Sequence, residues 1–255
     1  MSGKIKVLFA GEEVFFLSTI QKGYRNFNMG SNVENGTWFL DFLKRNGFEY
    51  DYIPTYHVSE EFPWTLEELK QYDVVVFSDV SSDTVLVSER TLNGKRSPNR
   101  LELIEQYVAE GGSFLMWGGY FSFTGLRGQG FYKRTPIERI LPVELMEYDD
   151  RVEVPEGFLP DVLLPEHPIL RGMPEKWEGF FLSYNRFFPK PNAQVLAMIP
   201  KYNDPFLVAG TYGKGRVLAS AVDCAPHGVS PEFLNWPCKD TLYANMLHWL
   251  TGGAE

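Results

Sequence analysis

The 255-residue sequence has few cysteines, no excess of basic charge and no long apolar run, and each shortage excludes a class of protein. Two cysteines, Cys224 and Cys238, are too few for a disulfide framework or a cysteine-based zinc site. The net charge of -9 and the lack of a dense basic cluster argue against a nucleic-acid partner. No apolar stretch approaches the ~20 residues that span a bilayer, so we expect no membrane partner.

The start of the chain carries no targeting signal that we can identify. Met1, Ser2, Gly3 and Lys4 lead directly into an apolar, β-branched run at residues 5–10. With so little cysteine, this pattern predicts a protein of the reducing cytoplasm.

The sequence has the apolar content of a large core, with 44% hydrophobic and 15% aromatic residues. Continuous apolar runs predict strands, and stretches with helical spacing of apolar residues lie between them. The expected strands cover residues 5–10, 50–54, 73–77 and 114–117, and the expected helices cover 37–45, 64–71 and 99–109. This alternation predicts an α/β fold, a flavodoxin-like, doubly wound and mostly parallel sheet with helices on both faces.

The second half of the chain is less regular. Residues 126–192 are rich in Pro, Gly and aromatics, and we interpret them as an insertion within a single domain that spans residues 1–255. Strands at 206–211 and 217–222 flank a Gly-Lys-Gly turn, which predicts a C-terminal β-hairpin, and a closing helix follows at 242–250. The aromatic side chains of the insertion predict either a cover for one sheet face or an interface between subunits of a homo-oligomer.

A glycine turn follows the expected strand at 114–117. Gly118 and Gly119 precede Tyr120, so a buried strand ends in a sharp turn that lifts one side chain to the carboxyl edge of the sheet. Hydrolases built in this way carry their nucleophile, Ser or Cys, on such a turn. The lifted residue here is Tyr120, which favours a role for it at a site but argues against the usual nucleophilic chemistry.

Polar side chains follow several of the predicted strands. Glu12 follows the first strand, Asp79 the third, Ser122 the glycine turn, and Asp223 the last. Ligands of open parallel sheets bind beyond the carboxyl ends of the strands. We therefore expect these residues and the Gly118–Gly119 backbone to line a pocket for a small polar molecule.

Three other groups have a functional and a structural interpretation. Cys224 and His227 lie close together in sequence. They fit either a catalytic thiolate with its base or a buried structural thiol with an unrelated loop histidine. Asp149 and Asp150 fit either a cation site or a salt-bridged turn with Arg151, and we favour the turn and predict no metal or other cofactor. Lys22 lies in an expected polar loop, where it contacts an anionic ligand or is simply solvated.

Taken together, these segments resemble the putative glutamine amidotransferase family of bacterial proteins, which has the class I glutamine amidotransferase-like fold. The resemblance runs along nearly the whole chain. The matching segments are 11–12, 22–23, 78–80, 118–123, 141–144, 149–153, 167–170, 212–216 and 223–227.

The resemblance implies a pattern of catalytic residues from which this sequence departs. In the class I glutaminases a cysteine on the turn attacks the glutamine amide and a His-x-Glu pair follows a late strand. Here Tyr120 has the place of the cysteine, and His227 lies near the place of the histidine. Val229 stands where the glutamate is expected, so the sequence predicts a relative without standard glutaminase activity.

Three functions follow from these patterns. The first is binding or hydrolysis of a small polar molecule, with Tyr120 and Ser122 as contacts, Glu12, Asp79 and Asp223 setting the charge, and His227 transferring protons. The second is a non-catalytic module for interaction or oligomerisation. The third is a thiol hydrolase that uses Cys224 and His227.

Overall fold

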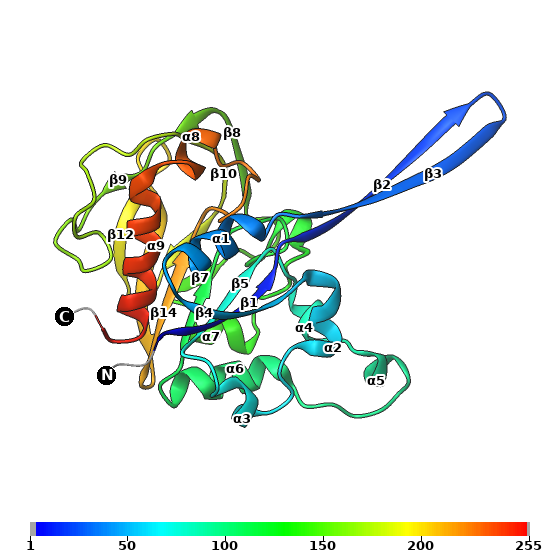
Figure 1. Cartoon of the computed structure of the whole chain (residues 1–255), viewed down its shortest axis with the longest axis horizontal. Coiled ribbons are helices and arrows are strands. Elements are labelled where there is room, and N and C mark those ends of the chain that lie inside the picture. The colour runs from blue at the N-terminus through cyan, green and yellow to red at the C-terminus, as the bar shows by residue number, and fades with distance from the viewer. Residues whose placement is uncertain (1–3, 254–255) are drawn as a thin grey trace.

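The computed structural model describes residues 4–253, so residues 1–3 and 254–255 of the expected domain lie outside it. Its central sheet has eight strands in the order β4-β1-β5-β6-β14-β13-β12-β9 (Figure 1). The bounds are β1 Lys6–Gly11, β4 Glu49–Ile53, β5 Val74–Ser78, β6 Ser113–Met116, β9 Asp161–Val162, β12 Gln194–Ile199, β13 Asp204–Tyr212 and β14 Gly215–Ser220.

Five neighbouring strands, from β4 to β14, are parallel, and the other three are antiparallel to their neighbours. The predicted flavodoxin-like, mostly parallel sheet is therefore confirmed. The C-terminal hairpin is confirmed as well, because β13 and β14 pair from Leu207–Ser220 to Tyr212–Gly215.

Helices cover both faces of the sheet. The bounds are α1 Thr37–Arg45, η1 Thr55–His57, α2 Val58–Glu61, α3 Leu66–Leu69, α4 Ser82–Leu86, α5 Glu89–Leu92, α6 Arg100–Ala109, η2 Leu126–Gly128, α7 Pro136–Ile140, α8 Pro231–Leu234 and α9 Pro237–Leu250. Phe9 packs on Phe39 of α1, whereas Phe77 packs on Phe62, which follows α2. Because Phe9 pairs with Val76, Phe9 and Phe77 point to opposite faces, and each face has its own aromatic core.

Local sequence explains where the helices begin and end. The Asn99 side chain caps α6 by accepting hydrogen bonds from Leu101 N and Glu102 N. Thr65 and Glu68 form a capping box that begins α3, so this helix is shorter than the expected 64–71. Gly47 follows α1 with φ +75°, in the left-handed conformation that ends helices.

The residues expected as an insertion form small strands and short helices packed on the sheet. β8 Arg151–Phe158 pairs with β10 Phe181–Asn185, and β7 Val143–Leu145 pairs with β11 Phe187–Pro189. Most of the aromatic side chains of residues 126–192 are buried: Tyr132, Phe158, Trp177, Phe181, Tyr184 and Phe187. The exposed ones are Phe131, Tyr148, Phe180 and Phe188, so the segment is mainly a cover for the core rather than an aromatic surface.

The prediction of a polar loop after the first strand is wrong. β2 Glu13–Lys22 and β3 Arg25–Glu34 form a long antiparallel hairpin, which we call the arm, that projects from the body of the molecule (Figure 1). Within the described residues, 4–253, the two strands pair only with each other. Lys22 lies beside the turn of this hairpin and is exposed, far along the arm from the sheet edge.

Candidate functional site

The carboxyl ends of β1, β5, β6 and β14 lie side by side, because these strands are parallel neighbours in the sheet. The residues that follow them bring three acidic side chains together: Glu12 after β1, Asp79 after β5 and Asp223 after β14. All three are buried. His227, four residues beyond Asp223, is the half-buried member of this group, which we call the acidic cluster.

Hydrogen bonds hold the acidic cluster only in part. Ser78 Oγ donates to Glu12 Oε1 at 2.5 Å, while among residues 4–253 no hydrogen-bond partner reaches Glu12 Oε2. His227 Nδ1 lies 3.9 Å from this oxygen and 3.3 Å from Asp223 Oδ2. The Glu12 and Asp223 carboxyls also interact with each other, so a proton shared between them would give this buried oxygen a partner.

Burial dominates the acid–base properties of the acidic cluster. Desolvation, together with the neighbouring Asp223 and Asp79 charges, raises the pKa of Glu12 well above its usual range. Desolvation also raises the pKa of Asp79, and it raises the pKa of Asp223 to about 7. The acidic cluster therefore holds protons near neutral pH, and carboxyls of this kind act as both acid and base.

Two of the acidic residues adopt backbone conformations that L residues rarely use. Glu12 has φ +64° and Asp79 has φ +50°, and each follows directly from a buried strand. Such conformations cost of order 1–3 kcal/mol and concentrate at functional sites. Both side chains are buried at the strand ends.

The glycine turn makes room for Asp79. Gly119 has φ +146°, and a Cβ there would lie 2.5 Å from Asp79 Oδ1. That oxygen accepts from Phe121 N at 2.6 Å, and Asp79 N donates to Ser122 Oγ at 3.1 Å. Ser122 is buried, and its hydroxyl supports Asp79. Gly118 does not border open space, because a Cβ there would lie 2.6 Å from the carbonyl oxygen of Ala221.

Asn35 was missed by sequence reasoning. It follows β3, donates through its backbone to Glu12 O at 2.9 Å, and places its side-chain nitrogen 2.9 Å from His227 Nε2. With this amide as donor, a neutral His227 carries its proton on Nδ1, toward Asp223. Its position becomes predictable only when β2 and β3 are known to pair, because the hairpin returns the chain to Glu12.

Arg151 is the second residue that the sequence did not assign to the site. Its guanidinium donates to Ser183 Oγ, pairs with Glu153 at 3.0 Å and lies 4.9 Å from the Tyr120 ring centroid. The Arg151 charge holds the pKa of Asp79 and Asp223 below the value that burial alone would give. Arg151 therefore supplies buried positive charge beside the acidic cluster.

Asp149 and Asp150 do not converge on one point. Asp150 accepts from Thr124 N at 2.8 Å and from Asn185 Nδ2 at 2.7 Å, and burial raises its pKa to about 6. Asp149 accepts from Arg127 N and Arg151 N. The expected turn is present, but hydrogen bonds to backbone and amide groups, rather than an Arg151 ion pair, hold the two carboxyls.

The remaining candidate residues differ in accessibility. Tyr120 is 44% exposed, and its ring lies beside the Arg151 guanidinium. Cys224 is only 1% exposed, its Sγ lies 3.5 Å from Ser78 Oγ, and burial raises the pKa of its thiol well above the usual value. Lys22 lies outside the site, on the hairpin.

Three side chains of the acidic cluster have the spacing of metal ligands. One ligand atom each from Glu12, Asp223 and His227 lies within 4.8 Å of the others. Carboxylate oxygens and imidazole suit several divalent metals. The same oxygens are equally suited to accept hydrogen bonds from a cationic or amide nitrogen of a ligand.

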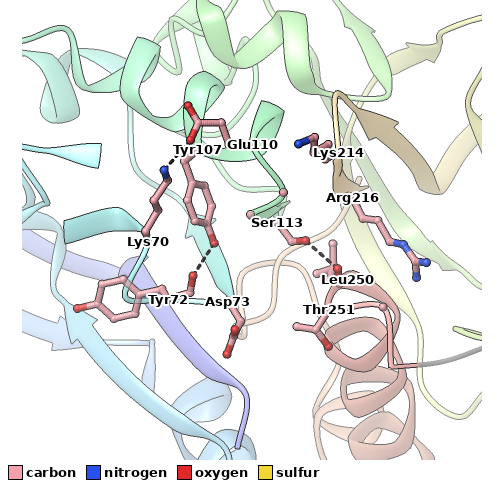
Figure 2. A pocket seen from close by; sticks show the side chains of 13 residues that line it. Lys70, Tyr72, Asp73, Tyr107, Glu110, Ser113, Lys214, Arg216, Leu250 and Thr251 are labelled. Carbon is pink, nitrogen blue, oxygen red and sulfur yellow. Dashed lines mark hydrogen bonds and ion pairs between the residues drawn. The ribbon is translucent and has the colours of Figure 1, made fainter. Parts of the chain in front are cut away.

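A cavity of about 550 Å³ lies at the opposite, amino-terminal edge of the strands, beside Asp73 and Ser113 (Figure 2). Its polar groups mostly bond to one another: Tyr107 Oη donates to Tyr72 O at 3.0 Å and Ser113 Oγ to Leu250 O at 2.7 Å. These contacts tie the ends of helices to the sheet at this edge.

Comparison with known proteins agrees with the fold and with the resemblance of the sequence. A family model described as "Putative glutamine amidotransferase" matches residues 6–252. No curated protein matches the chain. No helix among residues 4–253 has the length and apolar character required to cross a membrane.

Two solved structures from Salmonella typhimurium are similar over nearly the full length. The cytoplasmic protein STM3548 is 39% identical with a TM-score of 0.92, and the cytoplasmic protein STM1381 from strain LT2 is 41% identical with a TM-score of 0.91. In both cases 96% of this chain and 99% of the other are covered. A ThuA-like protein from Parabacteroides merdae, 15% identical with a TM-score of 0.57 over 99% of this chain and 91% of its own, shares the fold alone.

Proposed function

The chain belongs to the putative glutamine amidotransferase family, and from this premise we propose that it binds a small polar molecule at the acidic cluster and lacks cysteine-based glutaminase chemistry. The observation that carries the proposal is the convergence of Glu12, Asp79 and Asp223 beside His227 at the carboxyl edge. We also propose that it acts in the cytoplasm, since two relatives are named as cytoplasmic proteins.

The charge of the acidic cluster defines the class of ligand. Buried carboxyls with raised pKa values are stabilised by any group that donates hydrogen bonds or carries positive charge. Glu12 Oε2 still lacks a partner among the described residues, and the half-buried His227 lies next to it. We therefore propose a ligand with an ammonium, guanidinium or amide nitrogen directed at this oxygen.

Proton transfer is the chemistry that the acidic cluster supports. A carboxyl with a pKa of about 7, such as Asp223, exchanges protons efficiently at neutral pH. It lies 3.3 Å from His227 Nδ1, so the two groups can pass a proton to or from a bound ligand or water. Hydrolysis would then use an activated water rather than a covalent nucleophile.

The thiol hydrolase is disfavoured by the position of Cys224. Nucleophilic cysteines are partly exposed and have lowered thiol pKa values. Cys224 is buried, and its thiol pKa is raised by burial and by the charges of Glu12 and Asp223. We therefore do not propose Cys224 as a nucleophile.

A thermal-shift screen tests the proposal. Glutamine, arginine and other small molecules with nitrogen donors are added to the wild type, Asp79→Asn, His227→Ala and the control Asp41→Asn, which changes an exposed residue of α1. A ligand at 100 times its Kd stabilises the folded state by about 2.7 kcal/mol. We expect stabilisation of the wild type and the control but not of the two site variants.

Two results would contradict the proposal. The first is a screen in which no such compound stabilises the wild type, or in which the site variants respond like the control. The second is release of ammonia from glutamine by the wild type that is abolished by Cys224→Ser, because cysteine chemistry would then operate.

A further inference from the structure

Three members of the acidic cluster, Glu12, Asp223 and His227, form a group that we call the ligand triad. Each offers one ligand atom, and the three atoms lie within 4.8 Å of one another. Glu12 follows β1 and the other two follow β14, so segments far apart in the sequence build the group. The sequence-based prediction of no metal considered Asp149 and Asp150, which are adjacent and do not converge.

The spacing of the ligand triad is close to that of a tetrahedral metal site. His227 Nδ1 lies 3.3 Å from Asp223 Oδ2 and 3.9 Å from Glu12 Oε2. Zinc holds imidazole nitrogen and carboxylate oxygen at about 2.0–2.2 Å, so two ligand atoms of a tetrahedral site lie about 3.4 Å apart. The first contact has nearly this separation, and the second needs a movement of about half an ångström.

Glu12 Oε2 is buried and points into the ligand triad. Among residues 4–253 no hydrogen-bond donor reaches it, whereas Oε1 of the same carboxyl accepts from Ser78 Oγ at 2.5 Å. A buried carboxyl oxygen requires a proton or a cation. A proton shared with Asp223 meets this requirement without a metal, and a bound cation would take the place of that proton.

The charge around the ligand triad suits a doubly positive ion. Glu12, Asp79 and Asp223 are buried together and bring three negative charges when they are ionised. Arg151 acts on the Asp79 and Asp223 charges as the nearby cation, and it also pairs with Glu153. At least two negative charges therefore stay uncompensated, and one divalent ion would balance them.

We propose that the ligand triad binds a divalent transition-metal ion, best matched by Zn²⁺, through Glu12 Oε2, Asp223 Oδ2 and His227 Nδ1. Imidazole is a ligand that suits zinc, whereas Mg²⁺ and Ca²⁺ prefer shells of oxygen atoms. Three protein ligands leave the fourth position open, as in catalytic rather than structural zinc sites. The inference goes beyond the proposed function, because it concerns a metal ion and not an organic ligand.

Asn35 can hold His227 in the tautomer that the metal requires. A metal on Nδ1 leaves the imidazole proton on Nε2, which then donates a hydrogen bond. The Asn35 side chain lies 2.9 Å from Nε2, and a half turn of its amide presents the oxygen instead of the nitrogen at this contact. Asn35 N also donates to Glu12 O at 2.9 Å, so Asn35 is a positioning residue for two ligands.

His227 gives the ligand triad its access to solvent. The His227 side chain is 30% exposed, whereas the side chains of Glu12 and Asp223 are 0% exposed. A cation would enter past the imidazole and would then occupy Glu12 Oε2. The nitrogen donor of the proposed organic ligand uses the same oxygen, so the two ligands exclude each other.

Isothermal titration calorimetry of the full chain, first stripped with EDTA and then dialysed, tests the proposal with Zn²⁺ alone. We expect one ion to bind per chain, and to bind more tightly than Mg²⁺. His227→Ala and Glu12→Gln should each raise the Zn²⁺ dissociation constant by about a hundredfold or more, because each removes one ligand atom. Circular dichroism should show that both variants keep the fold.

His57→Ala is the matched control. His57 Nδ1 lies 2.8 Å from Glu61 Oε1, so this variant also removes an imidazole from beside a carboxylate, but both side chains are 57% exposed. The change should leave the Zn²⁺ dissociation constant of the ligand triad unchanged.

Two substitutions test the role of Asn35. Asn35→Ala should raise the Zn²⁺ dissociation constant by about tenfold or more, because the Nε2 proton loses its acceptor. Asn35→Asp keeps an acceptor oxygen at this position and should bind Zn²⁺ at least as tightly as the wild type. Equal constants for Asn35→Ala and the wild type would exclude the positioning role.

Other results would overturn the metal site itself. These are a wild type that does not bind Zn²⁺, binding that both His227→Ala and Glu12→Gln leave unchanged, and binding that His57→Ala weakens as much as His227→Ala does. The titrations contain no organic ligand, and the thermal-shift screen for nitrogen donors needs no added metal. Failure of one proposal is therefore distinguishable from failure of the other.

Discussion

Replacing Asp223 by asparagine should stabilise the folded protein, and the gain should grow with pH. Asp223 is buried beside Asp79, and burial raises its pKa from 3.8 to about 7. An acid whose pKa is higher in the folded state binds more protons there than in the unfolded chain. The free energy of unfolding therefore falls as pH rises from the unfolded to the folded pKa.

The size of this effect follows from the shift in the Asp223 pKa. One pKa unit corresponds to about 1.4 kcal/mol, so keeping Asp223 ionised costs at most about 4 kcal/mol at a pH of about 8. At a pH of about 5 the folded carboxyl is mostly protonated, and the cost is at most about 1.6 kcal/mol. Nearby Glu12 and Asp79 titrate with Asp223, so we expect Asp223→Asn to gain about 1 to 3 kcal/mol relative to wild type between these pH values.

Urea unfolding followed by tryptophan fluorescence measures this difference at both pH values, with six tryptophans as reporters. Asp41→Asn is the control, because Asp41 is exposed on α1 and its replacement should leave the pH dependence of wild type unchanged. An Asp223→Asn variant whose stability relative to wild type is constant or falls as pH rises would refute the reasoning. The acidic cluster would then be solvated or compensated in a way that its burial does not indicate.

Two further predictions concern the glycine turn and the buried thiol. Gly119→Ala should lower the free energy of unfolding by about 2 kcal/mol or more and abolish ligand binding, because its Cβ would displace Asp79 Oδ1. Gly172→Ala is the control: Gly172 has φ +80° but borders open space, so this change should lower the free energy of unfolding by only about 1 kcal/mol. Equal losses for the two variants in urea unfolding would contradict the collision. In a Cys238→Ser background, Cys224 should react with iodoacetamide only as fast as the protein opens, because its thiol is buried and its pKa is raised; rapid labelling of the folded protein, followed by mass spectrometry, would contradict this.

The parallel sheet was predictable from sequence because its strands are buried on both faces. Runs such as residues 74–77 are continuously apolar, and only a covered parallel sheet accommodates several of them. The positions of the strand ends were predictable as well, because each apolar run stops where its strand leaves the covered sheet. The first polar residues after the runs therefore lie together at the carboxyl edge of the sheet. Glu12, Asp79 and Asp223 could therefore be named together from the sequence alone.

The arm could not be found by the same reasoning, because its side chains do not enter the core. Residues 14–17 (Val, Phe, Phe, Leu) form a short apolar run, which indicates a buried strand, yet Phe15, Phe16 and Leu17 are 48%, 52% and 64% exposed. Their exposure follows from the pairing of β2 with β3, which holds the run away from the core.

Arg151 and Asn35 were missed for a different physical reason, since their roles depend on contacts between distant segments. Arg151 begins β8, and only its position at the β8–β10 pair carries its guanidinium over the Tyr120 ring. The charged sequence around it favoured a local ion pair, and Arg151 does pair with Glu153 at 3.0 Å. Backbone and amide donors satisfy Asp150, so the Arg151 guanidinium also reaches the Tyr120 ring.

The position of strain in the site shows how a glutaminase-like sheet can support different chemistry. The turn after β6, where the class I glutaminases carry a cysteine nucleophile, carries Tyr120 half exposed under Arg151. The left-handed acidic residues follow β1 and β5 instead, and Gly119 lacks a side chain at the point where Asp79 needs space. The turn thus leaves space for the Asp79 carboxyl, which comes from the neighbouring strand. The function that we propose for this arrangement is to move protons and to recognise nitrogen donors, and it does not need a nucleophile on the turn.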